Sequence, residues 1–190
     1  MTIIGLLGRS RCGKDTIARI LCDLLAPTHY DCVYIAKPLK DALASVYGFN
    51  EQHLYGHLKD VKDERYDMTP RDLCRYWSRN LMEMHGPDYF CRRLFKTMYD
   101  DARPTPRWVV ADVRYKHDCD AIKERGGVIW RVERTPLPLV VAGEAHIDLL
   151  PYDVLVQNNR GLDELEARVK AALQKTHETH PHLRTCKDAE

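Results

Sequence analysis

Short apolar runs alternate along this chain with longer segments in which apolar residues recur at helical spacing. The runs have the length and residue types of buried strands, and they occupy residues 2–7, 33–36, 108–111, 128–132 and 154–156. The segment 14–26, for example, carries an apolar stripe that predicts an amphipathic helix. Alternating strands and helices predict an α/β fold in which a five-stranded parallel sheet is covered by helices on both faces. A ligand is then expected at the carboxyl ends of the strands.

A helical segment interrupts this pattern between the second and third strands. Residues 49–68 are highly charged and weakly periodic, and we expect them to be mobile. Thr69 and Pro70 have the residue types that cap and open a helix, and another helix is expected over 88–101. We therefore predict one domain over 1–176, with a small helical excursion at about 48–102. Residues 177–190 are expected to be a polar, flexible tail, and their histidines are not expected to form a metal site.

The charge balance and the cysteines narrow the class of partner. Twenty-nine Lys and Arg against twenty-eight Asp and Glu give a net charge of +1, so the bulk charge does not favour nucleic acid or a membrane surface. No apolar run is long enough to span a bilayer, and the N-terminal run lacks the basic segment of a secretory signal. The seven cysteines show no CxxC spacing, which favours a reduced, cytoplasmic protein. A small anionic ligand is compatible with all of these features.

The segment 8–16 is the most informative motif, because it reads Gly-Arg-Ser-Arg-Cys-Gly-Lys-Asp-Thr between the first strand and the first helix. Glycines let backbone N–H groups turn around a phosphate, and the helix N-terminus adds donors and a positive dipole end. Asp15 stands where this motif usually has a Mg²⁺-binding hydroxyl, and its carboxylate can hold Mg²⁺ directly or through water. A strand–helix turn without a ligand is the simpler alternative. We expect the phosphates of ATP to bind to Arg11, Cys12, Gly13, Lys14, Asp15 and Thr16, with Lys14 also taking part in catalysis.

Two charged residues follow the third strand, at the edge where a ligand is expected. Arg114 can bind a substrate phosphate through two N–H groups and stabilise the transferred charge, so we assign it to catalysis as well as to substrate binding. Asp112 can orient the substrate or hold Mg²⁺ through water, although Asp112 and Arg114 could instead form a buried pair that fixes the loop. Asp118, at the start of the next helix, is expected either to bind the base or sugar of a substrate or to cap that helix.

A set of motifs, taken in order, resembles the phage deoxynucleoside monophosphate kinases. The set comprises Gly-Lys-Asp-Thr at 13–16, Ala-Lys-Pro-Leu-Lys-Asp-Ala-Leu at 36–43, Asp-Tyr-Phe at 88–90, Ala-Asp-Val-Arg at 111–114, and the segments 126–134, 146–147 and 153–159. The resemblance covers most of the chain and implies a three-layer P-loop NTPase fold that uses ATP and Mg²⁺ to phosphorylate a deoxynucleoside monophosphate. It also makes a homodimer plausible and, for a phage-encoded protein, implies the host cytoplasm. The chain departs from this family at Asp148 and Leu149, where a Ser/Thr-Glu pair is usual.

The resemblance assigns substrate-side residues in the helical excursion. Lys40 and Arg71 would contact the acceptor phosphate, although Lys40 could instead be a solvated lysine. Tyr89 or Phe90 is the candidate for stacking on the base. For Arg75, a solvated helix face is about as well supported as a role in binding.

Three further residues are assigned to the ATP side. Arg131 and Arg134 belong to the end of the fourth strand, and one of them would act as a lid arginine on the ATP phosphates, with a surface pair as the alternative. We include Arg134 among the catalytic candidates for this reason. Asn159 belongs to a loop that often borders the adenine in P-loop kinases, although it could also be a plain turn.

Other functions remain compatible with the phosphate loop. A P-loop kinase of another phosphorylated metabolite, such as dephospho-coenzyme A or phosphomevalonate, shares the same loop chemistry. A nucleotide-binding module without catalysis is a further alternative, whereas a GTPase is disfavoured because the chain has no Asn-Lys-x-Asp motif. An acceptor phosphate is already ionised at neutral pH, so this type of kinase needs no general base.

Overall fold

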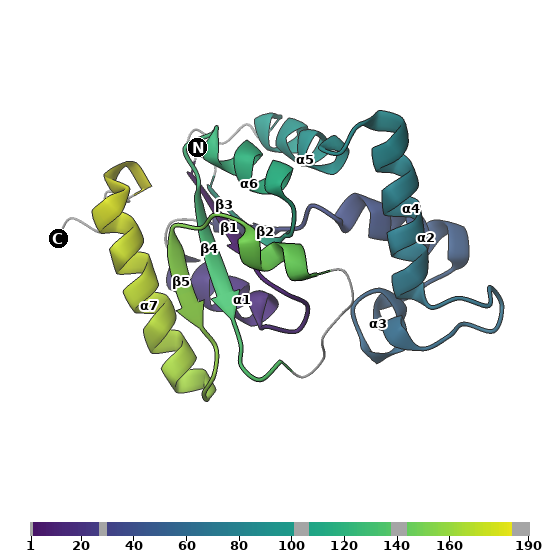
Figure 1. Ribbon diagram of the computed structural model, residues 1–190, viewed down its shortest axis with the longest axis horizontal. Coiled ribbons are helices and arrows are strands. Elements are labelled where there is room, and N and C mark those ends of the chain that lie inside the picture. Colours follow the sequence, from purple (N-terminus) through teal and green to yellow (C-terminus); the bar gives the residue numbers. More distant parts are fainter. Residues whose placement is uncertain (1, 27–29, 101–106, 138–143, 184–190) are drawn as a thin grey trace. The chain divides into compact units, whose positions relative to one another are not determined.

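The computed structural model describes residues 2–26, 30–100, 107–137 and 144–183 (Figure 1). The chain forms two compact units, of which the first contains Met1–Tyr34 and Lys96–Glu190 and the second contains Ile35–Phe95. The second unit starts earlier than the excursion predicted at about 48–102, because it includes the helix that follows the second strand. It also ends earlier than predicted, at Phe95. Among the described residues, no helix is long and apolar enough to cross a membrane.

The first unit is built on a parallel sheet of five strands. They are β1 (Thr2–Leu7), β2 (Tyr30–Val33), β3 (Arg107–Val113), β4 (Val128–Glu133) and β5 (Val154–Gln157). Their order in the sheet is β2-β3-β1-β4-β5, and every neighbouring pair is parallel. The predicted sheet is therefore confirmed, although β2 begins three residues earlier than expected. This order puts β1 at the centre, with the ends of β3 and β4 on either side of it.

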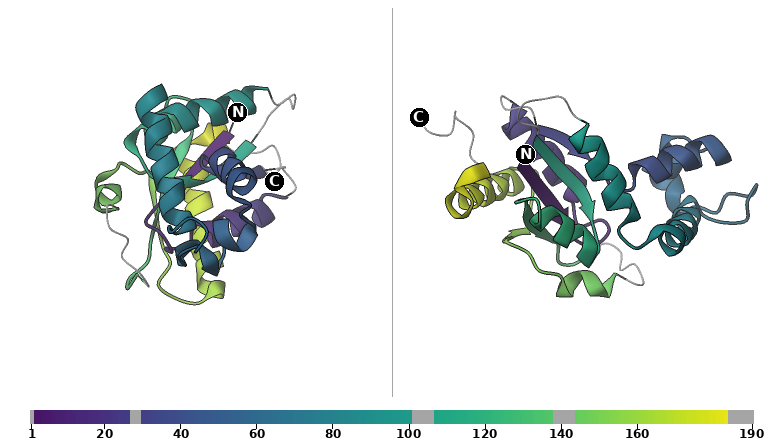
Figure 2. Two further views of the ribbon diagram at one scale, coloured as in Figure 1. Left: turned by 90° about the vertical axis from the view of Figure 1, so that its right-hand side faces the viewer. Right: turned by 90° about the horizontal axis from the view of Figure 1, so that it is seen from above.

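Helices cover both faces of this sheet. Helices α1 (Lys14–Leu24) and α7 (Leu162–Thr179) pack on each other, and Figures 1 and 2 show α7 alongside β5. Helix α6 (Lys116–Lys123) packs on β1 and β4. The side chains of β1 alternate to match, because Ile4 and Leu6 join the core cluster that contains residues of α1 and α7. Gly5 faces the opposite way, where a Cβ would come within 2.7 Å of Ile122 in α6.

The C-terminal segment is ordered further than the sequence indicated. Helix α7 continues to Thr179, and a short 3-10 helix, η4 (Pro181–Leu183), follows it. The Thr176 hydroxyl accepts a 2.9 Å hydrogen bond from the buried Trp130 indole, and Leu183 is only 1% exposed. The prediction of a flexible tail from residue 177 is thus wrong for 177–183, and residues 184–190 lie outside the described part of the chain. In the described ranges, no group of three or more His, Cys, Asp or Glu residues is arranged to hold a metal ion.

The second unit is helical. It contains α2 (Lys37–Tyr47), α3 (Glu51–Leu54), the 3-10 helix η2 (His57–Asp60) and α4 (Pro70–His85), and α5 (Tyr89–Tyr99) leads from it into the first unit. Thr69 caps α4 as predicted, because its side-chain oxygen accepts a 3.1 Å hydrogen bond from the Asp72 N–H.

Residues 49–68 form structured elements, which corrects the expectation of a mobile segment. An aromatic cluster joins this segment to the neighbouring helices. Tyr47 stacks on Phe49 at a ring distance of 5.4 Å and meets Tyr66 edge-on at 4.8 Å. The Trp77 indole donates a 2.9 Å hydrogen bond to the Tyr47 hydroxyl, so Trp77 packs inside this unit. These contacts come from three separate elements, and the local periodicity of 49–68 does not reveal them.

Candidate active site

The loop between β1 and α1 has a sharply turned backbone. Arg11 and Gly13 both adopt positive φ, at 63° and 102°. The loop lies close to its neighbours, because a Cβ on Gly8 would come within 2.6 Å of the Val132 carbonyl oxygen. Asn158, which follows β5, donates a 2.9 Å hydrogen bond from its side chain to the Cys12 carbonyl. The loop is therefore held in one curled conformation by β4 and by the residue that follows β5.

The Lys14 ammonium lies inside the curl of this loop. Lys14 is 7% exposed, and its Nζ donates to the Gly8 carbonyl at 2.6 Å and to the Arg9 carbonyl at 2.8 Å. Burial lowers the pKa of this ammonium, mainly by desolvation. A cation held in a desolvated loop at a helix N-terminus attracts an anion more strongly than one in bulk water does. The geometry of Lys14 therefore suits the phosphate-binding role expected from the sequence.

We expect Gly13→Ala to damage this loop, whereas Gly161→Ala, at the N-cap of α7, should have a much smaller effect. Gly13 needs a positive φ, and a Cβ there would lie 2.2 Å from the Asn158 amide nitrogen. Backbone strain alone should cost about 1–2 kcal/mol, and displacement of Asn158 should weaken nucleotide binding. Gly161 has open space around its Cβ position and a negative φ, so it is the matched control. Urea unfolding and ATP titration measure the two effects, and equal behaviour of the two variants would contradict the loop geometry.

Two carboxylates lie near the end of β2. Asp15 is in the first turn of α1, and its side chain hydrogen-bonds with that of Tyr34. The pKa of the Cys32 thiol is lowered mainly by its hydrogen bond with Cys22, while the negative charges of Asp15 and Asp112 oppose that shift. The charges of Asp15 and Asp112 thus both act on the Cys32 thiol. One or two carboxylates together with substrate phosphates are the ligands that Mg²⁺ commonly takes, so these residues fit the expected ion.

Arg114 is fixed at the end of β3 by interactions of both its backbone and its side chain. The Asp118 carboxylate accepts hydrogen bonds from the Arg114 N–H at 3.0 Å and the Tyr115 N–H at 2.9 Å. Asp118 is 2% exposed, so it caps α6 and fixes the turn that carries Arg114. Of the two roles predicted for Asp118, the structure supports the cap. The ring of His146 contacts the Arg114 carbonyl at 3.0 Å.

Glu144 is a residue of this site that the sequence analysis missed. Its carboxylate pairs with the Arg114 guanidinium at 3.2 Å and accepts a 2.8 Å hydrogen bond from the Ser10 backbone N–H in the phosphate loop. The Glu144 side chain is 9% exposed. It belongs to neither a strand end nor a recognisable motif, so no local sequence signal marks it.

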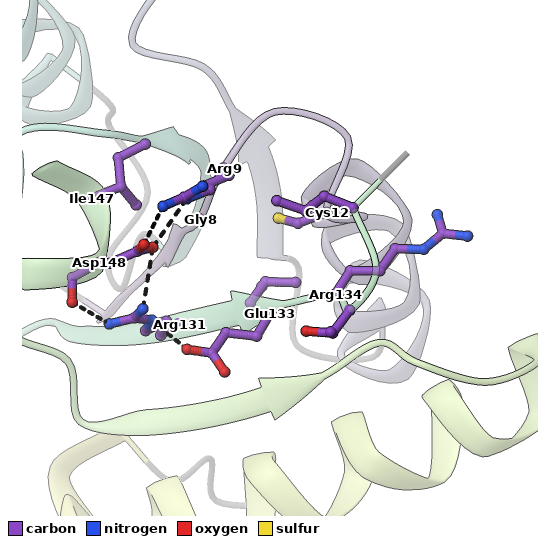
Figure 3. Close-up of a pocket in the computed structure, with 11 residues that line it drawn as sticks. Gly8, Arg9, Cys12, Arg131, Glu133, Arg134, Ile147 and Asp148 are labelled. Atoms are coloured by element: carbon purple, nitrogen blue, oxygen red, sulfur yellow. Dashed lines mark hydrogen bonds and ion pairs between the residues drawn. The ribbon is translucent and has the colours of Figure 1, made fainter. Parts of the chain in front are cut away.

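A pocket of about 310 Å³ lies beside the phosphate loop, between the end of β4 and the 3-10 helix η3 (Ala145–Leu149) (Figure 3). Asp148 of η3 pairs with Arg9 from the loop and with Arg131 from β4. Arg131 also donates a 2.7 Å hydrogen bond to the Asp148 carbonyl and pairs with Glu133 at 2.8 Å. The guanidinium of Arg134, in contrast, points away from this group in Figure 3. Both arginines line the pocket, and the choice of lid arginine stays a prediction.

Asn158 and Asn159 make contacts with different parts of the chain. The sequence predicts that Asn159 binds ATP, and in the structure its side-chain oxygen accepts a 2.7 Å hydrogen bond from the Thr135 N–H. It thus holds the turn that follows β4. Asn158 is the one whose side chain reaches the phosphate loop.

In the second unit, the two predicted substrate cations lie near the same thiol. Burial raises the pKa of Cys74 on α4, while the positive charges of Lys40 and Arg71 oppose that shift. Lys40 Nζ lies 3.8 Å from the centre of the Tyr55 ring, and Arg71 Nη2 donates to Asp60 at 3.2 Å. Each cation thus has a partner within this unit, and their binding of an acceptor phosphate stays a prediction.

Of the two residues predicted to stack on a base, Phe90 is buried and Tyr89 is partly exposed. Phe90 is 8% exposed and meets Tyr89 edge-on, so it packs in the core and is not open for stacking on a base. Tyr89 stacks on His85 at a ring distance of 4.9 Å. Arg75 pairs with Asp72 on the exposed face of α4, which agrees with the solvated alternative.

Comparison with known proteins places this chain in a family. The family model described as phosphomevalonate kinase matches residues 6–127, a stretch that contains the phosphate loop, Lys40, Arg71 and Arg114. A mimivirus protein (Acanthamoeba polyphaga mimivirus) described as "Putative deoxynucleotide monophosphate kinase" is 28% identical over 189 residues, which cover 89% of this chain and 94% of that protein. Dephospho-CoA kinase from Campylobacter jejuni has a similar fold, with a TM-score of 0.50 at 13% identity over 94% of this chain and 99% of that chain. The chain belongs to the phosphomevalonate kinase family of P-loop kinases, and it is a kinase of a phosphorylated metabolite.

Proposed function

We propose that this kinase transfers the γ-phosphoryl group of ATP to a deoxynucleoside monophosphate and so forms the diphosphate. The observation that carries the choice of acceptor is the match to the mimivirus protein, which extends over 89% of this chain and therefore includes both compact units. A match of this extent supports the acceptor side as well as the phosphate loop. The motifs at 36–43, 88–90 and 111–114 support the same acceptor.

The residues of the first unit fit the donor side of this reaction. The loop at 8–16 and the Lys14 ammonium would bind the β- and γ-phosphates of ATP, and Arg131 would approach them from β4. Asp15 and Asp112 would hold Mg²⁺, which neutralises phosphate charge when it is bound. Arg114 would stabilise the charge that spreads over the transferred phosphoryl group. Positioning and charge neutralisation suffice, because the acceptor is already an anion at neutral pH.

The second unit supplies the residues proposed for the acceptor. Lys40 and Arg71 carry two positive charges close to Cys74, which suits the phosphate of a monophosphate. Tyr55 lies under Lys40 and presents an exposed aromatic ring in the same neighbourhood. We do not assign base stacking to Phe90, because it is buried.

A panel of acceptors tests this proposal. The purified protein is given ATP and Mg²⁺ with the deoxynucleoside monophosphates, the ribonucleoside monophosphates, phosphomevalonate and dephospho-coenzyme A, one at a time, and ADP release is followed. We expect at least one deoxynucleoside monophosphate to give the highest kcat/KM. Phosphomevalonate is the second candidate, because the matching family model carries that description. Turnover with phosphomevalonate and with no nucleotide would overturn the proposed acceptor and leave the kinase assignment standing.

A further inference from the structure

Glu144 connects two parts of the active site that are far apart in the chain. One oxygen of its carboxylate pairs with Arg114 at 3.2 Å, and the other accepts the Ser10 N–H at 2.8 Å. Ser10 belongs to the phosphate loop, and Arg114 follows β3. A single carboxylate therefore fixes the distance between the loop and the arginine.

The backbone that carries Glu144 is itself firmly held. The Glu144 carbonyl accepts the Ile147 N–H at 3.1 Å, and Ile147 is 1% exposed. Asp148, one residue later, pairs with Arg9 and Arg131. The start of η3 is thus anchored by an apolar contact and by ion pairs, so the Glu144 side chain begins from a fixed point.

Burial gives the contacts of Glu144 their strength. The Glu144 side chain is 9% exposed, whereas that of Arg114 is 39% exposed. Screening by water is weak around the carboxylate, and a charge-assisted hydrogen bond is stronger there than on the surface. The exposed part of the guanidinium leaves N–H donors for a phosphate, because a guanidinium has five. Glu144 can therefore orient Arg114 without using up its donors.

We propose that Glu144 is a positioning residue that holds the Arg114 guanidinium against the phosphate loop in the orientation needed for phosphoryl transfer. This role rests on the proposed function, because it assumes that Arg114 acts on the transferred group. Glu144 itself contacts neither substrate in this proposal. Loss of the carboxylate should lower kcat about 10- to 100-fold, because small misplacements of a catalytic group have effects of this size. The KM for ATP should change little.

A double-mutant cycle separates positioning from a general structural role. Glu144→Gln, Arg114→Met and the double variant are compared with the wild type, using the best acceptor from the panel. We expect the double variant to be no slower than Arg114→Met alone, because without the guanidinium Glu144 has nothing to orient. If the double variant lost kcat by the product of the two single losses, the proposal would be overturned. A rise in the ATP affinity of Glu144→Gln would also overturn it. Glu144→Asp repeats the measurement if the glutamine variant does not fold, and Glu166→Gln on the exposed face of α7 is the matched control.

A second readout does not depend on activity. The order of the Arg114 Nε–H group is measured by ¹⁵N relaxation in the wild type and in Glu144→Gln. We expect the group to be ordered in the wild type and mobile in the variant, while Arg131, which Asp148 holds, stays unchanged. An Arg114 side chain that stays equally ordered in the variant would overturn the positioning role. If the wild type phosphorylates no acceptor while Arg114 loses order in the variant, the proposed function fails and the positioning contact stands.

Discussion

Replacing Lys14 with methionine is expected to lower phosphoryl transfer by about 10³-fold, because the charge at the centre of the phosphate loop is lost. The ammonium is buried. It donates hydrogen bonds to the backbone carbonyl oxygens of Gly8 and Arg9 and contacts the Cys12 sulfur. Methionine keeps the length and the apolar stem of the side chain. Turnover is measured by ADP release, and ATP affinity by titration.

The same substitution should leave the fold intact. Removal of a buried charge relieves its desolvation, whereas two carbonyl groups lose a donor, so the two effects on stability oppose each other. We expect the free energy of unfolding to change by no more than about 1–2 kcal/mol, measured by urea unfolding. Lys170→Met is the control, since Lys170 is exposed and pairs with Glu166 on α7. Activity within tenfold of the wild type in Lys14→Met would contradict the role given to this lysine.

Replacing Arg114 with methionine is expected to lower kcat about 10²- to 10³-fold, with a small change in the KM for ATP. The guanidinium acts on charge that develops during transfer, so its loss affects the transition state more than ground-state binding. Arg114→Lys should recover only part of the rate, because an ammonium keeps the charge but lacks the planar fork. Steady-state kinetics with both substrates varied separates kcat from the two KM values.

A matched arginine controls for the loss of charge. Arg79 on α4 is exposed and lies 4.0 Å from Glu83, and Arg79→Met should leave the kinetics unchanged. If Arg114→Met raised only the KM of the acceptor, Arg114 would be a binding residue without a special role in transfer. A wild-type rate in Arg114→Met would remove it from the site altogether.

The sheet and its helices could be predicted because their signals are local. Parallel strands buried on both faces leave short apolar runs, and the runs at 2–7, 128–132 and 154–156 agree with the observed strands to within one residue. The order at 177–183 and the structure of 49–68 could not be predicted in this way. Leu183 is one apolar residue in a polar segment, and the Tyr47 cluster depends on contacts between separate elements.

The candidate site also contains residues that a local sequence pattern predicts and residues that depend on distant contacts. The phosphate loop and Lys14 could be recognised because a strand, a glycine-rich turn and a helix follow one another in the chain. Glu144 contacts Ser10 across 134 positions of sequence, so no local pattern reveals it. Asn158 bonds to the phosphate loop, whereas its neighbour Asn159 bonds to the turn after β4. The sequence alone does not show which of the two reaches the loop.

The transfer of a labelled phosphoryl group tests the central claim most directly. The protein is incubated with [γ-³²P]ATP, Mg²⁺ and each deoxynucleoside monophosphate, and the products are separated by chromatography, with Lys14→Met as the control. We predict that the label moves from ATP into a deoxynucleoside diphosphate in the wild type and stays in ATP in the variant. Label that remains in ATP or appears only as inorganic phosphate with every deoxynucleoside monophosphate would contradict the account.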